Sequence, residues 1–167
     1  SEKKLWISTL IKNQSLHIAQ GVDFDENNEQ GAGDQGLMFG YACNETPEFM
    51  PLPIIISHRL AERLALVRKN GTLNWLKPDG KSQVTIKYDV NNNPIKVEKV
   101  VVATQHADML DKFSSEEEEH QYIKENIIKH VILPVLKEYE LDCDNDFLVN
   151  GTGRFVEGGP IADVGLT

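Results

Sequence analysis

The clearest hydrophobic pattern in the chain is helical and follows two prolines, Pro51 and Pro53. Apolar residues then recur three and four positions apart, which is typical of a helix with one buried face. These residues are Ile55, Ile56, Leu60, Leu64 and Val67. Proline is tolerated in a first helical turn, and the basic pair at 68–69 suits a helix C-terminus. The pattern predicts a helix that ends at Asn70-Gly71.

A second helical pattern begins at a capping box, Ser115-x-x-Glu118. Four acidic residues at 116–119 fall in the first turn, where negative charge complements the helix dipole. Apolar residues at helical spacing then form a stripe that we expect to be buried. They are Ile123, Ile127, Ile128 and Val131. Because proline lacks the N–H that a helix interior needs, Pro134 is predicted to end this helix.

Strands are predicted by alternation and by short apolar runs. Residues 81–88 alternate between apolar and polar side chains, which indicates a half-buried strand. Residues 89–94 are predicted to turn, and 95–104 to return as the antiparallel partner. Two apolar runs, Gly36–Cys43 and Phe147–Asn150, predict two further strands.

The order of these elements is strand, helix, two strands, helix, strand. It predicts an α/β (α+β) fold, a two-layer sandwich with the helices on one face of the sheet. Outside these elements, Leu5–Ile11 has the pattern of the last turns of a helix, and the acidic stretch Gln20–Gln30 is expected to be a mobile surface loop. Gly151–Thr167 is too rich in glycine for a packed element.

Composition and charge limit the kinds of molecule that this protein is expected to bind and the sites that it is expected to contain. The 167 residues include 17 Lys and Arg against 26 Asp and Glu, giving a net charge of −9. This sign disfavours a polynucleotide or an anionic membrane, but a few local cations or amides can still hold a small phosphate. No apolar run approaches the roughly 20 residues of a membrane span, and no secretory signal is seen, so we expect a cytoplasmic protein. Cys43 and Cys143 have no neighbours at metal-ligand spacing, which predicts neither a disulfide framework nor a zinc site.

Three patterns suggest chemistry that their context argues against. Gly31–Gly36 fits the dinucleotide fingerprint GxGxxG, but it follows an acidic loop and places Asp34 where a pyrophosphate would lie. Asp34 suits either a substrate ammonium group or simple solvation. The alternating aspartates of 142–146 lack the glycine and glutamate of a calcium loop. The five histidines show no pairing with a Ser or Cys nucleophile.

Two loops contain residues that suit a nucleotide. Lys77–Lys81 presents one carboxylate and two ammonium groups where a turn enters a strand, a set that can hold ribose hydroxyls and phosphates. The alternative interpretation is a charged hairpin entrance. Thr152–Pro160 combines Arg154, the aromatic Phe155 and glycine amides, and Asp163 follows it closely.

Seven stretches together resemble the methionine adenosyltransferases, also called S-adenosylmethionine synthetases. They are Gln14-Ser15, Ile18–Asp23, Gly31–Ala42, Val67–Leu73, Pro78–Thr85, Thr104–His106 and Thr152–Thr167. They follow the family's order and cover nearly the whole chain. The resemblance implies a β-α-β-β-α-β repeat, one of three similar intertwined subdomains. It also implies active sites between two identical subunits of a homodimer or homotetramer.

The resemblance further implies a reaction between ATP and L-methionine. The methionine sulfur attacks C5′ of ATP and displaces triphosphate, which is hydrolysed to pyrophosphate and phosphate. Catalysis then rests on positioning and electrostatics, without a covalent protein intermediate. Mg²⁺ and K⁺ assist at the phosphates, with ligands expected mainly outside this chain. We expect no metal ligand among its own site residues.

The resemblance assigns site residues position by position. Methionine is assigned to Gln14, Asp34 and Asp163. ATP is assigned to Asp79, Gly80, Lys81, Thr152, Gly153, Arg154, Phe155 and Asp163. Within these sets Lys81 and Asp163 are the catalytic residues, Lys81 binds phosphate, and Phe155 stacks on adenine.

Some positions depart from the family pattern. Leu16-His17 replaces a usual Pro-Asp, which bears on the stiffness of that loop. Gly151 replaces a usual proline and Glu157 a usual aliphatic residue, and both bear on the shape of the adenine loop. The family's histidine-aspartate segment before Ser1 and its lysine-bearing segment after Thr167 have no counterpart.

We therefore expect the central portion of a methionine adenosyltransferase, inactive alone. Residues 1–30 would belong to a neighbouring subdomain with the mobile gating loop, 31–155 to a central α/β domain, and 156–167 to a Gly-rich exit segment. The alternative is a catalytically inactive binding or regulatory module that retains the fold.

Overall fold

A computed structural model describes residues 8–23, 26 and 29–163 of the chain. The chain divides into two compact units, residues 1–41 and residues 42–167. In the first unit the described residues form one short helix, α1 (Leu16–Val22), and no strand. The helix expected at Leu5–Ile11 is wrong over residues 8–11, which are not helical, while residues 5–7 lie outside the described part. Residues 20–22 of the expected loop belong to α1.

The strand predicted at Gly36–Cys43 is not formed. Met38 and Phe39 are 91% and 93% exposed, and the described residues offer this stretch no neighbouring strand. A strand needs hydrogen-bond partners for its backbone as well as apolar side chains. The apolar run has the side chains of a buried strand, but the residues that the structure describes supply neither pairing nor burial for it.

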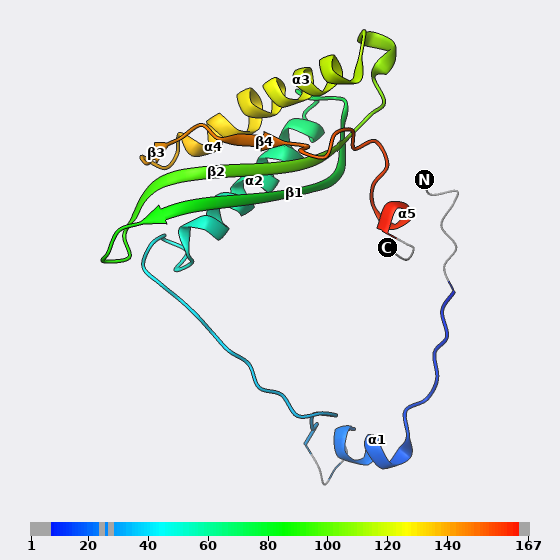
Figure 1. The fold of residues 1–167 in the computed structure, drawn as a ribbon. Coiled ribbons are helices and arrows are strands. Elements are labelled where there is room, and N and C mark those ends of the chain that lie inside the picture. Colours follow the sequence, from blue (N-terminus) through cyan, green and yellow to red (C-terminus); the bar gives the residue numbers. More distant parts are fainter. Residues whose placement is uncertain (1–7, 24–25, 27–28, 164–167) are drawn as a thin grey trace. The chain divides into compact units, whose positions relative to one another are not determined.

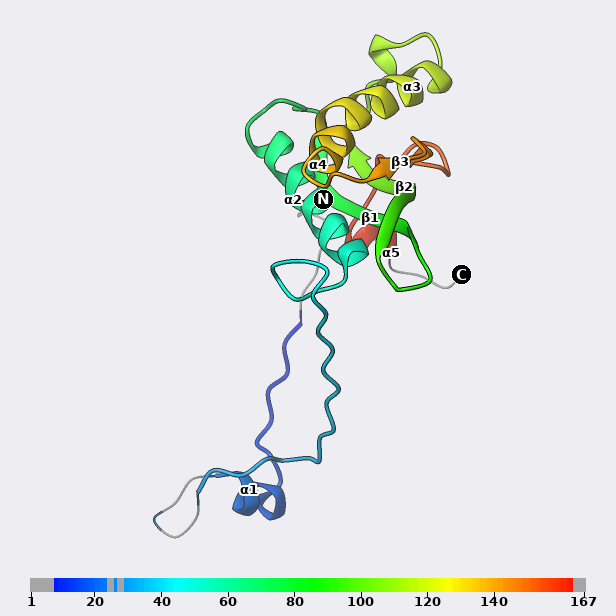
Figure 2. The ribbon, with the colours of Figure 1, turned by 90° about the vertical axis from the view of Figure 1, so that its left-hand side faces the viewer.

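The second unit is a two-layer sandwich, as predicted, with its sheet built around one long strand (Figures 1 and 2). The central strand is β2 (Pro94–His106), and β1 (Leu76–Tyr88) pairs with it in antiparallel fashion. Along the other edge of β2, the short strands β3 (Asp142–Cys143) and β4 (Phe147–Val149) pair in parallel with successive stretches. The predicted hairpin is confirmed, and both of its strands are longer than predicted.

Two long helices cover one face of this sheet (Figure 2). They are α2 (Leu52–Lys69) and α3 (Glu116–Ile127), and both predicted helices are thereby confirmed. A π-helical turn, η3 (Ile128–Ile132), continues α3 into α4 (Leu133–Leu136). Two short elements complete the unit, the 3₁₀ turn η2 (Leu110–Lys112) and α5 (Pro160–Asp163).

The core lies between the helices and the sheet. Ile56 and Leu60 of α2, and Ile123 and Ile127 of α3, are at most 1% exposed and cluster with Val100 of β2. Burying side chains of this size contributes about 1.5–3 kcal/mol each. This packing makes the sheet a rigid base for the loops at its ends.

The start of α3 follows the predicted capping box with a small shift. The Ser115 hydroxyl accepts a hydrogen bond from the Glu118 N–H at 3.3 Å. The Glu118 carboxylate reaches back to the N–H of Ser114, at 2.8 Å, instead of that of Ser115. Both bonds satisfy backbone donors that a helix start leaves unpaired.

The prediction that Pro134 ends the second helix is wrong. Proline cannot donate to the carbonyl four residues earlier, which is that of His130. In the structure, Arg63 of α2 donates from Nε to the His130 carbonyl at 2.9 Å. The π-helical turn η3 immediately precedes α4, and Pro134 lies in the first turn of α4. A neighbouring helix thus supplies the missing donor, which the local sequence does not reveal.

Candidate functional site

The loop at residues 150–159 crosses one end of the sheet and gathers several predicted site residues there. It is tied to the last residues of β2 and to the first residues of β1. Val156 accepts a hydrogen bond from the Gln105 side chain at 3.0 Å, and Gly159 donates to the Asp79 carboxylate at 2.8 Å. Residues some 50 and 80 positions apart along the chain are therefore held together at this end.

The loop begins with a side chain that extends the sheet. Asn150 is 3% exposed, and its amide group accepts from the Thr104 N–H at 2.8 Å and donates to the Thr104 carbonyl at 3.1 Å. Asn150 has a φ of 45°, a conformation that asparagine tolerates better than most residues. The Asn150 side chain thus continues the pairing of β4 with β2 by one residue, at the point where the backbone leaves the sheet.

The turn that follows contains two predicted ATP residues, Thr152 and Gly153. The Gly153 N–H donates to the Asn150 carbonyl at 2.8 Å, and Gly153 has a φ of 104°. That φ is readily accessible only to glycine. Thr152 is exposed at the tip of the turn, so its hydroxyl and the adjacent backbone are open to solvent.

Asp79 is half-buried at the start of β1 and faces the loop. Its Oδ2 accepts from Gly159, and the described residues donate no hydrogen bond to its Oδ1. A Cβ on Gly158 would stand 2.8 Å from Asp79 Oδ2 and 3.0 Å from the Phe155 ring. Gly158 is therefore required for the close approach of Asp79, Phe155 and the loop backbone. This arrangement leaves one carboxylate oxygen free to accept a hydrogen bond from a ligand.

Gly80 and Lys81 continue β1 beyond Asp79. They pair with Thr104 and Ala103 of β2. Lys81 is exposed, and within residues 8–23, 26 and 29–163 it makes no ion pair. Its ammonium group, two residues along the strand from Asp79, is consequently available to bind an anion.

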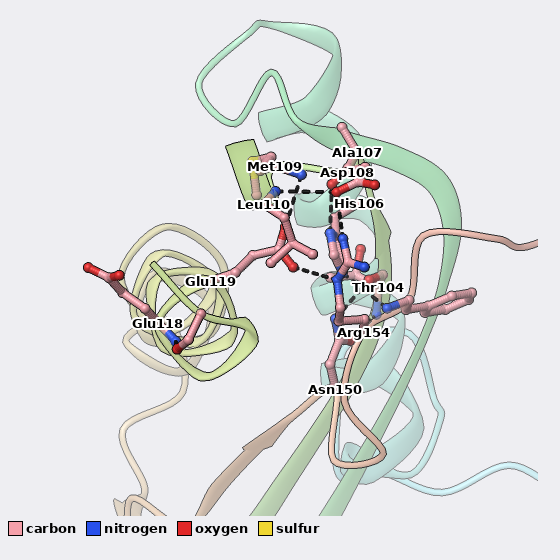
Figure 3. Close-up of polar contacts among 12 residues, drawn as sticks. Thr104, His106, Ala107, Asp108, Met109, Leu110, Glu118, Glu119, Asn150 and Arg154 are labelled. Atoms are coloured by element: carbon pink, nitrogen blue, oxygen red, sulfur yellow. Dashed lines mark hydrogen bonds and ion pairs between the residues drawn. The ribbon is translucent and has the colours of Figure 1, made fainter. Parts of the chain in front are cut away.

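Arg154 is fastened by two carboxylates (Figure 3). Its Nε donates to Glu119 at 2.8 Å, and its Nη2 donates to Asp108 at 2.6 Å. The hydrogen bond to Glu119, together with that to Asp108, raises the pKa of Arg154. The Leu110 N–H, with a further contribution from Arg154, lowers the pKa of Asp108. The charge of Arg154 is thus balanced within the protein, and the side chain anchors the loop to α3.

Glu119 is the site residue that sequence reasoning missed most clearly. It is 0% exposed, and its second oxygen accepts from the Met109 N–H at 2.9 Å. The sequence pattern identifies it only as a first-turn acid of the helix. Glu119 lies four residues before Ile123 and eight before Ile127, so helical spacing places it on the buried stripe. This spacing is the sequence signal that could have identified Glu119. His106, buried beside Phe155, likewise has no role in the sequence-based assignment.

The remaining predicted residues are exposed. Asp163 ends α5, and in the described part its carboxylate makes no hydrogen bond or ion pair. Gln14 and Asp34 belong to the first unit, where the Asp34 carboxylate accepts, among the described residues, only from the N–H of the next residue, Gln35, at 2.7 Å. The methionine-binding role of Gln14, Asp34 and Asp163 stays a prediction.

The described residues do not form a metal centre or a membrane span. No three His, Cys, Asp or Glu side chains among residues 8–23, 26 and 29–163 come close enough to hold a metal ion. In the same residues, no helix combines the length and the apolar character needed to cross a bilayer.

The chain is similar to known proteins over most of its length. The family described as S-adenosylmethionine synthetase, central domain, matches residues 29–155. The S-adenosylmethionine synthase of Petrotoga mobilis (strain DSM 10674 / SJ95) is 51% identical over an alignment of 171 positions, which covers 96% of this chain and 41% of that protein. The chain thus spans about two fifths of the length of this relative. Since the family match covers well over half of its residues, the chain belongs to the S-adenosylmethionine synthetase family and contains its central domain.

Proposed function

We propose that the protein containing this chain is a methionine adenosyltransferase, which forms S-adenosylmethionine from ATP and L-methionine and releases phosphate and pyrophosphate. In this proposal the chain supplies part of the ATP site. The observation that supports it most is the meeting of Asp79, Phe155 and the glycine-rich loop at one end of the sheet. A carboxylate with a free oxygen, an aromatic ring and a nearby unpaired lysine suit ribose, adenine and phosphate respectively.

The proposed reaction is a direct displacement. A lone pair of the methionine sulfur forms the S–C5′ bond while the C5′–O bond of ATP breaks, and the electron pair leaves with triphosphate. The sulfur becomes a sulfonium cation, and triphosphate is then hydrolysed to phosphate and pyrophosphate. The protein needs no covalent intermediate, so its contribution is alignment of sulfur and carbon and stabilisation of the leaving charge.

Each residue has a place in this scheme. Asp79 accepts from ribose hydroxyls, Lys81 attracts the leaving triphosphate, and Phe155 stacks on adenine, with Gly80, Thr152, Gly153 and Arg154 shaping the pocket around them. Asp163 is shared by ribose and methionine, and Gln14 and Asp34 contact methionine. Lys81 and Asp163 are proposed as catalytic because they would act on the charges that change during displacement.

The proposal has wider parts that concern the whole protein. They are a homodimer or homotetramer with the site between subunits, Mg²⁺ and K⁺ bound mainly outside this chain, and a place in the cytoplasm. The proposed domain division is 1–30, 31–155 and 156–167.

The test is an assay of the full-length protein with ATP and labelled L-methionine. We expect labelled S-adenosylmethionine together with equal amounts of phosphate and pyrophosphate, and a large loss of product in Lys81→Met. Lys87→Met, a change at another exposed lysine of β1, is the matched control and should stay active.

The alternative, an inactive binding module, predicts a different result. ATP would then bind with no release of phosphate, and the encoding reading frame would lack the metal-binding and lysine-bearing segments of the family. Either finding would contradict the enzyme proposal.

A further inference from the structure

His106 holds both backbone groups of Phe155. The His106 N–H donates to the Phe155 carbonyl at 2.9 Å, and the Phe155 N–H donates to the His106 ring nitrogen Nε2 at 3.0 Å. His106 is 1% exposed at the end of β2, where it pairs with Leu76 of β1. The aromatic residue of the loop is therefore fixed by a residue of the rigid sheet.

The partners of the ring determine its tautomer. Nδ1 lies 2.8 Å from the Ala107 carbonyl, which only accepts, so Nδ1 carries the hydrogen. Nε2 faces a backbone N–H, which only donates, so Nε2 presents its lone pair. Ala107 is itself held, because its N–H donates to the Trp75 carbonyl at 2.8 Å. The bond from Nδ1 to Ala107 thus orients the His106 ring, and Nε2 on the opposite side of the ring accepts from Phe155.

The Phe155 ring has little freedom once its backbone is held. It lies so close to Gly158 that a Cβ on that glycine would stand 3.0 Å from ring atom Cε2. A small rotation of the backbone at Phe155 would move the ring relative to Asp79, which lies against the same glycine. The relative placement of the aromatic ring and the carboxylate thus depends on the His106 bonds.

We propose that His106 is a positioning residue for the ATP site: through Nε2 it fixes the orientation of Phe155 and so sets the affinity for the nucleotide. This inference rests on the proposed function. His106 touches no reacting atom in this role, and it acts only through the loop. Its effect should therefore fall on ATP and leave L-methionine largely untouched.

Three substitutions of His106 in the full-length protein separate positioning from general stability. His106→Leu fills the space without an acceptor, His106→Asn places its amide too near the backbone to reach Phe155, and His106→Gln can offer a carbonyl oxygen near the place of Nε2. We expect KM for ATP to rise about tenfold in His106→Leu, since a buried N–H loses its acceptor. His106→Gln should remain within about threefold of the wild type, and KM for L-methionine should change little in all three.

The matched control is another histidine that binds the backbone of a distant segment. His120 of α3 hydrogen-bonds through Nε2 to the Val149 carbonyl at 2.8 Å, whereas His106 bonds to Phe155. His120→Leu therefore loses a comparable bond outside the loop. It should lower the thermal midpoint while leaving KM for ATP unchanged.

A second measurement does not depend on catalysis. Hydrogen exchange of the full-length protein should show faster exchange at the Phe155 amide in His106→Leu, and protection restored in His106→Gln. If the wild type formed no product, the proposed function would be contradicted. The exchange measurement would still test whether His106 holds the backbone of Phe155.

The inference is overturned if His106→Leu keeps the wild-type KM for ATP and wild-type exchange at Phe155. It is also overturned if both KM values and kcat change together with the thermal midpoint and glutamine rescues none of them. Should His106→Leu not fold, the comparison of His106→Asn with His106→Gln decides in the same way, because only glutamine reaches Phe155.

Discussion

The two ends of the β1–β2 hairpin are closed by different kinds of polar contact. At the turn end, the Asp89 carboxylate has only local partners among the described residues, and it accepts from the N–H groups of Asn91 and Asn93, each at 2.8 Å. Asn92 between them has a φ of 62°, which asparagine tolerates. The five consecutive residues 89–93 contain every partner of this carboxylate among the described residues.

At the loop end, the partners are distant in the sequence. Asp79 pairs with Gly159, and Arg154 pairs with Glu119. These contacts form only when the sheet, α3 and the loop have assembled. They also leave Asp79 Oδ1 without a donor in the described residues, whereas the Asp89 carboxylate uses both oxygens on its own turn. A locally satisfied network stabilises the fold, whereas a long-range network can leave a group free for a ligand.

The largest expected effect at the loop end concerns stability. Glu119→Ala removes one of the two carboxylates that bind Arg154 and leaves the Met109 N–H without an acceptor, and each lost bond costs about 1–3 kcal/mol. Denaturant unfolding of the full-length protein measures this. Glu117→Ala, an exposed first-turn acid of the same helix, is the control and should change little. Equal stability of the two variants would mean that the Arg154 anchor is not important.

Next in size is an effect on turnover alone. Asp163→Asn removes a negative charge proposed to be shared by ribose and methionine, so kcat/KM should fall about a hundredfold or more. The unfolding midpoint should not move, because the carboxylate is exposed and unpaired among the described residues. Asp111→Asn, another exposed aspartate, should keep full activity. Unchanged kinetics in Asp163→Asn would refute its assignment.

A smaller effect is expected at the aromatic residue of the loop. Phe155→Ala removes the stacking surface and should raise KM for ATP about tenfold, with KM for L-methionine nearly constant. Phe155→Tyr keeps the ring and should behave like the wild type. Steady-state kinetics with each substrate varied in turn distinguishes these outcomes, and a constant ATP affinity in Phe155→Ala would rule out stacking.

The smallest effect is expected at the turn end and depends on pH. The side chain of Asn93, followed by its N–H, lowers the pKa of Asp89 in the folded protein. A lowered folded pKa adds stability that is present above about pH 4 and is lost as the pH falls through the folded value. Asp89→Asn should therefore melt a few degrees below the wild type near neutral pH. Thermal melts at successively lower pH, below the ordinary aspartate pKa of about 4, should show the difference closing; a constant difference would contradict the role of the charge.

The sequence is sufficient for elements whose pattern and partners are local. The alternation in β1 and β2 and the helical spacing around Leu60 and Ile127 correspond directly to the buried residues. Gly36–Cys43 has a strand-like composition but finds no pairing strand in the described residues. Pro134 has the pattern of a helix end, but Arg63 of another helix donates to the His130 carbonyl, to which Pro134 cannot donate. Neither the missing pairing strand nor the donor from Arg63 is visible in the local sequence.

The candidate site shows the same division. Motifs identify Asp79 and Phe155, and the structure brings both against Gly158. The motif containing Arg154 suggests a free cation, yet its charge is taken up by Glu119 and Asp108. A sequence motif reveals which side chains are present, but not how much of their charge is already used by neighbours.

The bond from Arg63 to the carbonyl of His130 also bears on how the second unit folds. The chain from α3 through η3 to α4 contains a carbonyl that Pro134 cannot satisfy, so this helix is incomplete until α2 lies beside it. An isolated peptide of this helix should fray near the proline, because the His130 carbonyl gains the Arg63 side chain as its donor only when the two helices dock. One proline thereby makes the completion of one helix conditional on the other, which favours all-or-none folding of the layer they form.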